Sequence, residues 1–307
     1  MFDTLFFSVV IPLYNKEDYI ENTLKSVLAQ SYQNFEIIVV NDGCTDNSVT
    51  VVTNLKSDFV SIIHQKNLGL SAARNSGIRA SKHNYIAFLD ADDLWCEDYL
   101  QTIKKLITIN PTESVYTTAS AILRPWQTPN LNAQPFDVDQ VISTSNYFTF
   151  KKNFFSNSSL VIKKEVFDTI GYYNEHINYG EEEDFSIRCF SKYKLVHYNA
   201  SKVYYLKGLE NQLTAPNNKI ERKIPDYSKY LTKENYKTLK PYIDFVHFKL
   251  IMLYKMERNK KLVKIFKDKV SISNLNLIQK IKFIMPTPLF YYSKHIYLWF
   301  TKVVSHS

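Results

Sequence analysis

Residues 6–48 read FFSVVIPLYNKEDYIENTLKSVLAQSYQNFEIIVVNDGCTDNS, and this stretch decides the fold. Two runs within it, residues 6–13 and 35–40, are apolar and rich in β-branched side chains. Such runs are typical of strands that are buried on both faces of a sheet. Between them, residues 17–31 place apolar side chains at helical spacing. The stretch therefore predicts a strand, a helix and a second strand.

The alternation continues through a strand at 59–63, a helix at 70–81 and a strand at 85–89. This predicts an α/β fold with a doubly wound, mostly parallel sheet. In such sheets ligands bind where the carboxyl ends of the strands meet. The notable polar and turn residues follow strand ends, so we expect them to converge on one edge: Pro12 to Asn15, Asp42, Asn67 and Asp90 to Asp93.

The remaining chain divides into two parts. Residues 111–150 have little periodicity and predict mixed strand and loop. Beyond them we expect a strand at 158–163, a helix at 181–193 and one or two strands within 195–206. From about residue 217 the sequence is rich in Lys and Tyr, with apolar residues at helical spacing. We therefore expect an α/β domain over residues 1–216 and a basic, aromatic-rich helical extension over 217–307.

Asp90 and Asp92, with Asp93 beside them, form an acidic cluster at the end of a predicted buried strand. Carboxylates packed this closely repel one another unless a cation or hydrogen-bond donors neutralise them. Mg²⁺ or Mn²⁺ commonly bridges such carboxylates to substrate phosphates. The cluster predicts a metal–diphosphate site, whereas Asp93 has the alternative of capping the helix that follows.

Other residues are candidates for binding and acid–base roles, each with a structural alternative. Asp42 can accept a hydrogen bond from a pyrimidine base or form a turn before Gly43. Arg74 suits a phosphate or a buried carboxylate, and its alternative is a helical ion pair. Asn67 and Gly69 fit a tight turn that lets the backbone approach a ligand. These assignments stay open from the residues alone.

The acidic run from Glu181 to Asp184 opens a predicted helix. Acidic side chains in a first helical turn are favoured by the helix dipole, so the acidic run can have a purely structural role. If the helix start faces the same edge of the sheet, one carboxylate can act as a general base. At 3.6 residues per turn, only one or two of the four face a given cleft.

Charge is distributed unevenly along the chain, whose net charge is +8. Residues 217–307 contain 19 basic residues (Lys and Arg) and 6 acidic residues (Asp and Glu). Residues 1–216 contain 19 basic and 24 acidic residues. Such a basic region suits an anionic membrane, a nucleic acid or a phosphorylated acceptor. The three cysteines do not have the spacing of metal ligands, so we expect them to be reduced thiols. The N-terminus has the pattern of a first strand and not of a signal peptide, so we expect a cytoplasmic protein.

Two segments of the extension, residues 243–254 and 289–304, combine aromatic and aliphatic residues with flanking Lys. Long apolar stretches of this kind fit a membrane interface better than a nucleic acid. We therefore expect an anionic membrane surface as a partner, no nucleic acid, and a peripheral position at the inner face of the cytoplasmic membrane. The alternative is that these helices pack on the α/β domain with the lysines in solvent.

These motifs together resemble the inverting family 2 glycosyltransferases, which have the Rossmann-like GT-A fold. Residues 8–48 resemble the family's first nucleotide-binding unit. NLGLSAARNSGI at 67–78 and YIAFLDADD at 85–93 resemble its second unit and its DxD motif. The segment at 158–190, which contains YGEEEDF, resembles its acceptor segment and acidic base motif. The resemblance covers roughly residues 6–207, with a nucleotide-sugar half over about 1–110 and an acceptor half over about 111–216.

The resemblance implies a role for individual residues. The nucleotide-sugar site would comprise Pro12, Tyr14, Asn15, Asp42, Asn67, Gly69, Arg74 and Asp90, with Asp42 on the base, usually uracil. Asp92, together with Asp90, would bind Mn²⁺ or Mg²⁺. The family's usual base, an Asp, aligns with Glu182, and this departure leaves Glu181 and Asp184 as alternatives. The stretch YYLKGLENQ at 204–212 offers no His as a third metal ligand.

The resemblance also implies a reaction. A hexosyl or N-acetylhexosaminyl group of a nucleotide-diphosphate sugar, expected to be a UDP-sugar, would pass with inversion to a hydroxyl of a glycan or lipid-linked acceptor. The expected pathway is bacterial surface polysaccharide synthesis. One alternative is an inactive binding or scaffold protein with the same fold. A second is a nucleotidyltransferase, which needs a Gly-rich loop after the first strand, where this chain has IPLYNKEDY.

Overall fold

The structure is a computed structural model that describes residues 5–150, 155–208, 212, 215–217, 219 and 221–304, with side chains described as far as residue 296. The chain forms two compact units. The first comprises residues 1–147, 152–209 and 223–225, and the second comprises residues 148–151, 210–222 and 226–307. The predicted boundary at residue 216 falls in a short described run, residues 215–217, between residues that are not described, and it stays a prediction.

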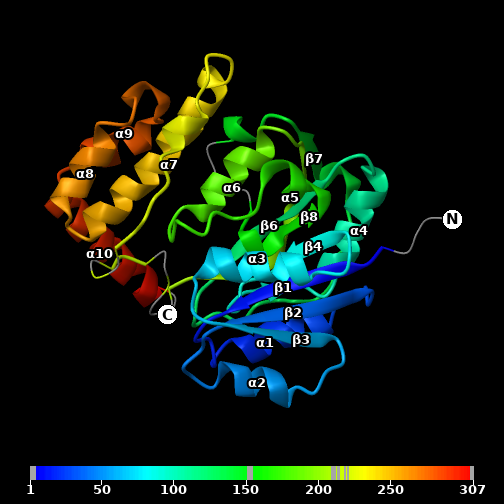
Figure 1. The fold of residues 1–307 in the computed structure, drawn as a ribbon. Coiled ribbons are helices and arrows are strands. Elements are labelled where there is room, and N and C mark those ends of the chain that lie inside the picture. The colour runs from blue at the N-terminus through cyan, green and yellow to red at the C-terminus, as the bar shows by residue number, and fades with distance from the viewer. Residues whose placement is uncertain are drawn as a thin grey trace. The chain divides into compact units, whose positions relative to one another are not determined.

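The N-terminal half of the first unit is a parallel sheet with the strand order β3-β2-β1-β4. Its strands and helices follow the predicted alternation closely (Figure 1): β1 (Phe7–Leu13), α1 (Ile20–Leu28), β2 (Phe35–Asp42), α2 (Ser48–Asn54), β3 (Val60–Gln65), α3 (Leu70–Ala80) and β4 (Tyr85–Phe88). The α/β prediction is confirmed here because each apolar run is a strand of the sheet; β1, β2 and β4 are largely buried, whereas β3 is a partly exposed edge strand.

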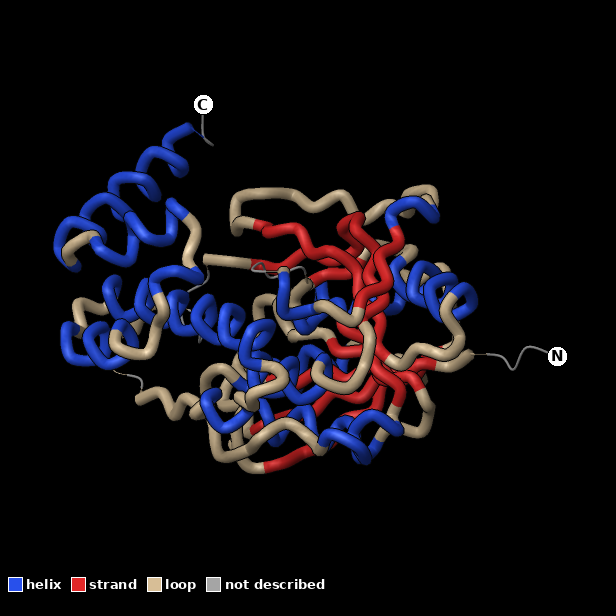
Figure 2. Tube along the Cα trace, turned by 90° about the horizontal axis from the view of Figure 1, so that it is seen from above, coloured by secondary structure: helices blue, strands red, loops and turns tan. Residues whose placement is uncertain are grey.

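The sheet continues beyond β4 with strands of mixed direction, in the order β8-β6-β9-β5, and β7 pairs with β9. The elements are β5 (Leu94–Trp95), α4 (Tyr99–Ile109), β6 (Val115–Leu123), η1 (Val138–Gln140), β7 (Val141–Thr144), η2 (Tyr147–Thr149), η3 (Asn157–Ser159), β8 (Leu160–Lys163), α5 (Glu165–Ile170), α6 (Glu181–Phe190) and β9 (Leu195–Leu206). Figure 2 shows the strands together, with helices along both sides. The aperiodic region 111–150 is the mixed strand and loop that was expected.

Strand β1 shows why both faces of the sheet are covered. Successive side chains of a strand point to opposite faces. Phe7, Val9 and Ile11 lie in one buried cluster with apolar side chains of α1 and α4. On the opposite face, Val10 meets helix α3 at Gly77, where an added Cβ would lie 2.2 Å from Cγ1 of Val10. A continuous apolar run is therefore needed in β1, and a residue without a side chain is needed at position 77.

Replacing Gly77 with Ala should lower the free energy of unfolding by about 1–3 kcal/mol, because the added methyl group overpacks the α3–β1 contact. The loss should appear although Ala is a better helix former than Gly. Urea denaturation of the variant measures it. In a chain that also carries Val10→Ala, the loss of unfolding free energy caused by Gly77→Ala should be less than about half of the loss in the native chain, because residues in contact are energetically coupled. Equal costs in both backgrounds would contradict the packing argument.

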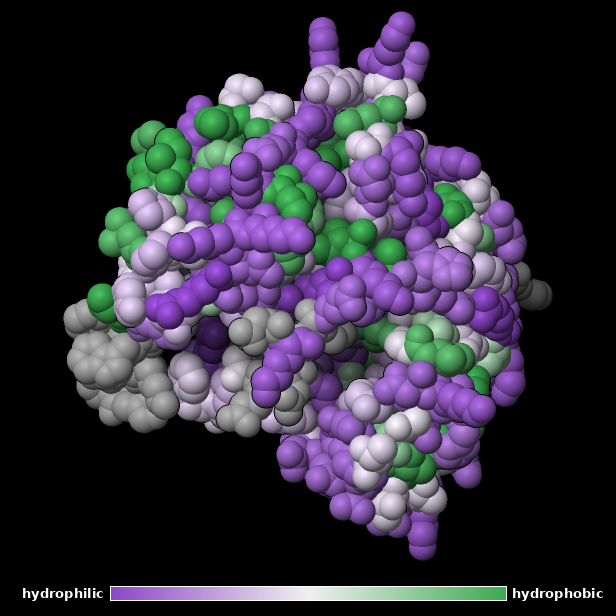
Figure 3. All heavy atoms as spheres, turned by 60° about the vertical axis from the view of Figure 1, so that its left-hand side comes forward, coloured by the Kyte–Doolittle hydropathy of each residue, from purple (hydrophilic) through white to green (hydrophobic). Residues whose placement is uncertain are grey.

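The second unit is helical, as expected for the C-terminal extension, and its elements are η4 (Tyr227–Tyr230), α7 (Tyr236–Met256), α8 (Lys260–Lys267), η5 (Ile272–Asn274), α9 (Leu277–Ile284) and α10 (Thr287–Val304). Figure 3 shows a face on which apolar patches lie among polar side chains. Among the described residues, no helix combines the length and hydropathy needed to cross a membrane.

Helix α7 corrects one expectation about the extension. Residues 243–254 were expected to face a membrane, and that expectation is wrong. None of these side chains is exposed, and Ile243, Val246, Ile251 and Tyr254 are each at most 4% exposed. The apolar residues of α7 form the core of the second unit, against which α8, α9 and α10 pack. The other segment, 289–304, lies within α10, and its side chains beyond residue 296 lie outside the described residues.

Candidate active site

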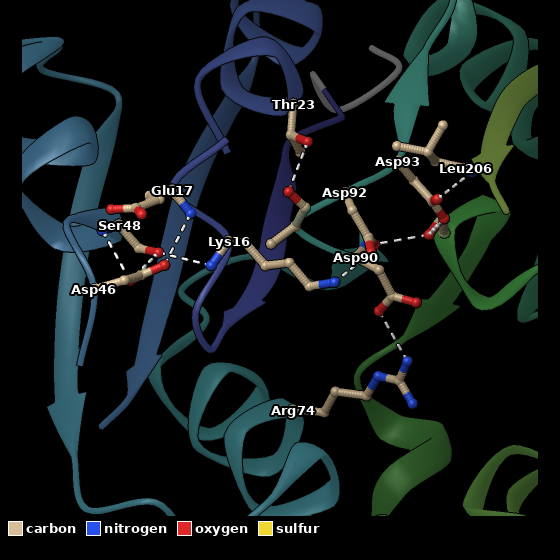
Figure 4. A network of polar contacts seen from close by, with 12 residues as sticks. Lys16, Glu17, Thr23, Asp46, Ser48, Arg74, Asp90, Asp92, Asp93 and Leu206 are labelled. Carbon is tan, nitrogen blue, oxygen red and sulfur yellow. Dashed lines mark hydrogen bonds and ion pairs between the residues drawn. The ribbon is translucent and has the colours of Figure 1, made fainter. Parts of the chain in front are cut away.

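The loop after β1 is held against the loop after β2 by polar contacts (Figure 4). Asn15 adopts a left-handed backbone conformation with φ of 50°, and its side-chain Oδ1 accepts a hydrogen bond from the Thr45 amide at 2.8 Å. The Lys16 amide donates to Ser48 Oγ at 2.7 Å, and the Glu17 amide donates to a carboxylate oxygen of Asp46 at 3.1 Å. These bonds fix where the Lys16 side chain leaves the backbone.

Asp42 holds the loop after β3. One of its carboxylate oxygens accepts from Gln65 Nε2 and the Leu68 amide at 2.7 and 2.8 Å, and the other accepts from the Gly69 amide at 2.9 Å. The residue is only 3% exposed. Gly43 lets the two loops approach closely, because a Cβ there would lie 2.8 Å from the Asn67 amide nitrogen. The structure thus gives Asp42 a loop-holding role, and its contact with a base stays a prediction.

The other residues predicted after β1 lie in different environments. Pro12 is buried within β1, where the pairing with β2 continues to Leu13 but the pairing with β4 ends at Val10. A proline is tolerated there because the strand has already separated from one neighbour. Tyr14 is 46% exposed beside this edge of the sheet. Of the residues after β1, Tyr14 is therefore available to a ligand.

Arg74 of α3 gathers three carboxylates at the edge of the sheet. Its side chain is fully buried. Nη2 donates to Asp90 Oδ1 at 2.9 Å and to Glu182 Oε1 at 3.1 Å, and Nη1 lies 3.8 Å from Glu181 Oε1. A planar guanidinium carries five donors and can hold several carboxylates together. Arg74 therefore joins the predicted metal motif to the predicted base motif, although Arg74 and Glu182 are 108 positions apart.

Asp92 is paired with Lys16, a residue that the sequence interpretation did not select. Lys16 Nζ lies 2.6 Å from Asp92 Oδ2, and Figure 4 shows the two side chains pointing toward each other. Desolvation raises the pKa of the Asp92 carboxyl, and the Lys16 charge opposes this rise. The position of Lys16, three residues after the end of β1, was the available signal.

Asp90 and Asp92 fit a divalent cation that is shared with a diphosphate. Their side chains are 25% and 12% exposed, so both can be reached from solvent. One or two carboxylates completed by substrate phosphates and water are a usual environment for Mg²⁺. Among the described residues there is no group of three or more metal-ligating side chains. The two aspartates therefore need oxygen ligands from a bound substrate to complete a metal site.

Asp93 and Asp184 have structural partners. Asp93 is fully buried; it accepts a hydrogen bond from Ser158 Oγ and another from the Leu206 amide at 2.9 Å. Burial and the neighbouring aspartates raise its pKa well above the usual range. Asp184 is 1% exposed and pairs with Arg188 at 3.0 Å, one helical turn later. The Asp184 carboxylate is therefore inaccessible to an acceptor, and the i, i+4 spacing of this pair was a signal in the sequence.

Glu182 is the most exposed of the three carboxylates that contact Arg74. Its side chain is 44% exposed, against 11% for Glu181. Desolvation raises the pKa of Glu182 to about 7; the Arg74 charge opposes the rise and the Asp90 charge adds to it. Desolvation also raises the pKa of Glu181. A general base is most effective when its pKa lies near the working pH, so Glu182 fits the predicted role, and the choice of base stays a prediction.

The fold is the GT-A fold of glycosyltransferases. The structure of Staphylococcus aureus TarS in complex with UDP-GlcNAc superposes with a TM-score of 0.64, covering 88% of this chain and 83% of that one at 15% identity. The family model described as Glycosyl transferase family 2 matches residues 8–171. The chain therefore belongs to glycosyltransferase family 2, and the resemblance found in its motifs is confirmed.

Individual relatives match part of their own length. Streptococcus pneumoniae glycosyltransferase GlyA is 42% identical over 102 residues, which are 33% of this chain and 15% of GlyA. Bacillus subtilis EpsJ, an uncharacterized glycosyltransferase, is 28% identical over 214 residues, which are 67% of this chain and 62% of EpsJ. The chain thus spans less than two thirds of the length of either relative.

Proposed function

We propose that the protein is a metal-dependent, inverting glycosyltransferase. It moves a hexosyl or N-acetylhexosaminyl group from a UDP-sugar to a hydroxyl of a glycan or lipid-linked acceptor in cell-surface polysaccharide synthesis, on the cytoplasmic side. The single observation that carries the proposal is the cluster around Arg74. It brings Asp90 of the acidic motif and the accessible Glu182 to one buried guanidinium. The proposed leaving-group site and the proposed base are thereby held by the same side chain.

In this reaction Glu182 accepts the proton of the attacking acceptor hydroxyl. Arg74 orients the Glu182 carboxylate, because a hydrogen bond of 3.1 Å fixes Oε1. Asp90 and Asp92 would hold Mn²⁺ or Mg²⁺, which supplies Lewis-acid neutralisation of the diphosphate leaving group. Lys16 adds a second positive charge beside Asp92. Attack from the face opposite the leaving group inverts the configuration without a covalent intermediate.

The donor is proposed from the relative and from the loops at the sheet edge. TarS was solved with UDP-GlcNAc and with UDP. In this chain we assign the nucleotide to the surface formed by Pro12, Tyr14, Asn15, Asp42, Asn67 and Gly69. The exposed Tyr14 ring offers a stacking or packing surface. The buried Asn41 supports this surface from the end of β2, because its Nδ2 lies 3.0 Å from His64 Nδ1 and its Oδ1 accepts a hydrogen bond from the Cys44 amide at 2.9 Å.

Isothermal titration with UDP, ADP and GDP tests the donor assignment. UDP should bind, and Mn²⁺ should strengthen its binding by about 5- to 150-fold over a sample with EDTA, because both ligands share the diphosphate oxygens. ADP and GDP should bind more weakly under the same conditions. Equal binding of all three nucleotides would contradict a uracil site, and no binding of any of them would favour the scaffold alternative.

A further inference from the structure

The outer side of α9 carries four exposed apolar side chains. Leu277, Ile278, Ile281 and Ile284 are 75%, 63%, 54% and 67% exposed. At 3.6 residues per turn these positions fall within about 120° of the helix circumference. Single exposed apolar residues are ordinary, but a contiguous group of them marks an interaction surface. We call these four residues the α9 arc.

The α9 arc belongs to a firmly placed helix. The opposite side of α9 is buried through Gln279 and Phe283. At the N-terminus Asn276 forms a capping box with Gln279. At the C-terminus the buried Lys255 ammonium of α7 donates to the carbonyls of Phe283 and Met285, at 3.1 and 2.6 Å. Hydrogen bonds thus pair backbone groups at both ends of α9. The helix is firmly held, and the α9 arc faces away from the core of the second unit.

Helix α10 repeats the pattern at its start. Leu289, Tyr292 and Ile296 are 57%, 56% and 57% exposed, and their spacing of three and four residues places them on one side of the helix. Phe290 is buried against the unit. Two successive helices therefore each expose large apolar side chains while burying an opposite side.

The charge around these residues is positive. Lys280 and Lys282 stand on the two flanks of the α9 arc when the helix is viewed down its axis at 3.6 residues per turn. Residues 269–307 contain five Lys and no Asp or Glu. Long Lys stems can lie along an apolar surface while their ammonium groups reach anionic headgroups. A second copy of the chain would bring two basic surfaces together, which like-charge repulsion opposes.

We propose that α9 and the start of α10 bind the surface of an anionic lipid bilayer. The α9 arc, with Leu289, Tyr292 and Ile296, enters the interface, and the flanking lysines contact the headgroups, as in interfacial amphipathic helices. This inference deepens the proposed function, since a lipid-linked acceptor is presented at a bilayer. It replaces the expected contribution of residues 243–254, which are buried in α7.

Co-sedimentation with vesicles tests the surface without any sugar donor. The full chain should pellet with phosphatidylcholine vesicles that contain phosphatidylglycerol, and much less with phosphatidylcholine alone. Binding should weaken as salt rises, because surface charges are screened. Ile278→Glu with Ile281→Glu should weaken binding by about tenfold or more, since two apolar side chains no longer enter the interface. Thermal melting checks that this variant remains folded.

A matched control uses exposed apolar residues of the first unit. Ile122 and Val138 are 54% and 62% exposed, and Ile122→Glu with Val138→Glu should bind vesicles like the native chain. Equal pelleting of the native chain and the α9 variant would overturn the proposal. A native dimer that the α9 variant dissociates, without vesicle binding, would assign the surface to a second copy instead. Vesicle binding by a protein without turnover would leave this inference standing while the proposed function fails.

Discussion

Replacing Glu182 with Gln should lower kcat by about 100-fold or more and leave UDP binding within about twofold. Gln keeps the shape of the side chain and the contact to Arg74 but cannot accept the acceptor proton. We favour this residue because its side chain contacts Arg74 and is 44% exposed, whereas the two alternative bases, Glu181 and Asp184, are 11% and 1% exposed. Steady-state turnover and UDP titration of the same preparation separate the two effects.

The pH profile gives the same prediction an independent readout. A general base acts in its deprotonated form, and desolvation raises the pKa of Glu182 to about 7. Native turnover should therefore rise as the pH increases through about 7 and fall away below it. An ordinary exposed Glu has a pKa near about 4.3, so a rise of turnover centred at about pH 7 would show that the surroundings of Glu182 raise its pKa. Glu182→Gln should remove this rise together with the activity.

Glu183→Gln is the matched control for the base. It makes the same chemical change one position further along α6, where the proposed mechanism assigns no role, and turnover should stay within about threefold of native. Normal turnover in Glu182→Gln combined with an inactive Asp184→Asn would contradict the assignment. The base would then be Asp184, and its pairing with Arg188 would have to open during the reaction.

Replacing Asp92 with Asn should reduce transfer by about 100- to 1000-fold, the range for losing one electrostatic contact to a developing charge. The variant keeps the volume of the side chain but loses the negative charge that would bind the metal. It also leaves the Lys16 ammonium without its partner at 2.6 Å. Addition of Mn²⁺ or Mg²⁺ should no longer stimulate the residual activity, which a metal titration of the initial rate measures.

The control for Asp92 is Asp139→Asn, which removes an exposed carboxylate from η1 and should leave both the rate and its metal dependence unchanged. The decisive comparison is the native enzyme in excess chelator. Full activity with EDTA would contradict the metal role of Asp90 and Asp92. Lys16 would then be the cation that remains beside the leaving group.

The fold was predictable because each strand of the parallel half is a separate apolar run. The need for a glycine at position 77 could not be predicted from the sequence, because it arises from a contact with Val10, which is distant in the chain. The strand ends and the family motifs predicted that Asp90 and Glu182 belong to one site, whereas their common contact with Arg74 appears only in the structure. Lys16 follows a strand end as the predicted residues do, but a Lys in a loop is usually a solvated charge, and only the folded loops place it at Asp92.

Errors in the extension have a physical cause as well. Helical periodicity shows that a segment has an apolar side but does not show what covers that side. Residues 243–254 are apolar over most of their circumference and form the core of the second unit as part of α7. Helix α9 has only eight residues, and its apolar positions on opposite sides meet different surroundings. Burial, which the sequence does not contain, distinguishes the two helices.

The most direct measurement is release of nucleoside diphosphate from a panel of nucleotide sugars by the native protein, with Mn²⁺ or Mg²⁺ and with EDTA, in parallel with Glu182→Gln. We predict that a UDP-sugar is turned over, that EDTA stops the reaction, and that Glu182→Gln lowers the rate by about 100-fold or more. Turnover that is unaffected by both EDTA and Glu182→Gln, or no turnover of any nucleotide sugar with glycan and lipid-linked acceptors supplied, would contradict this prediction.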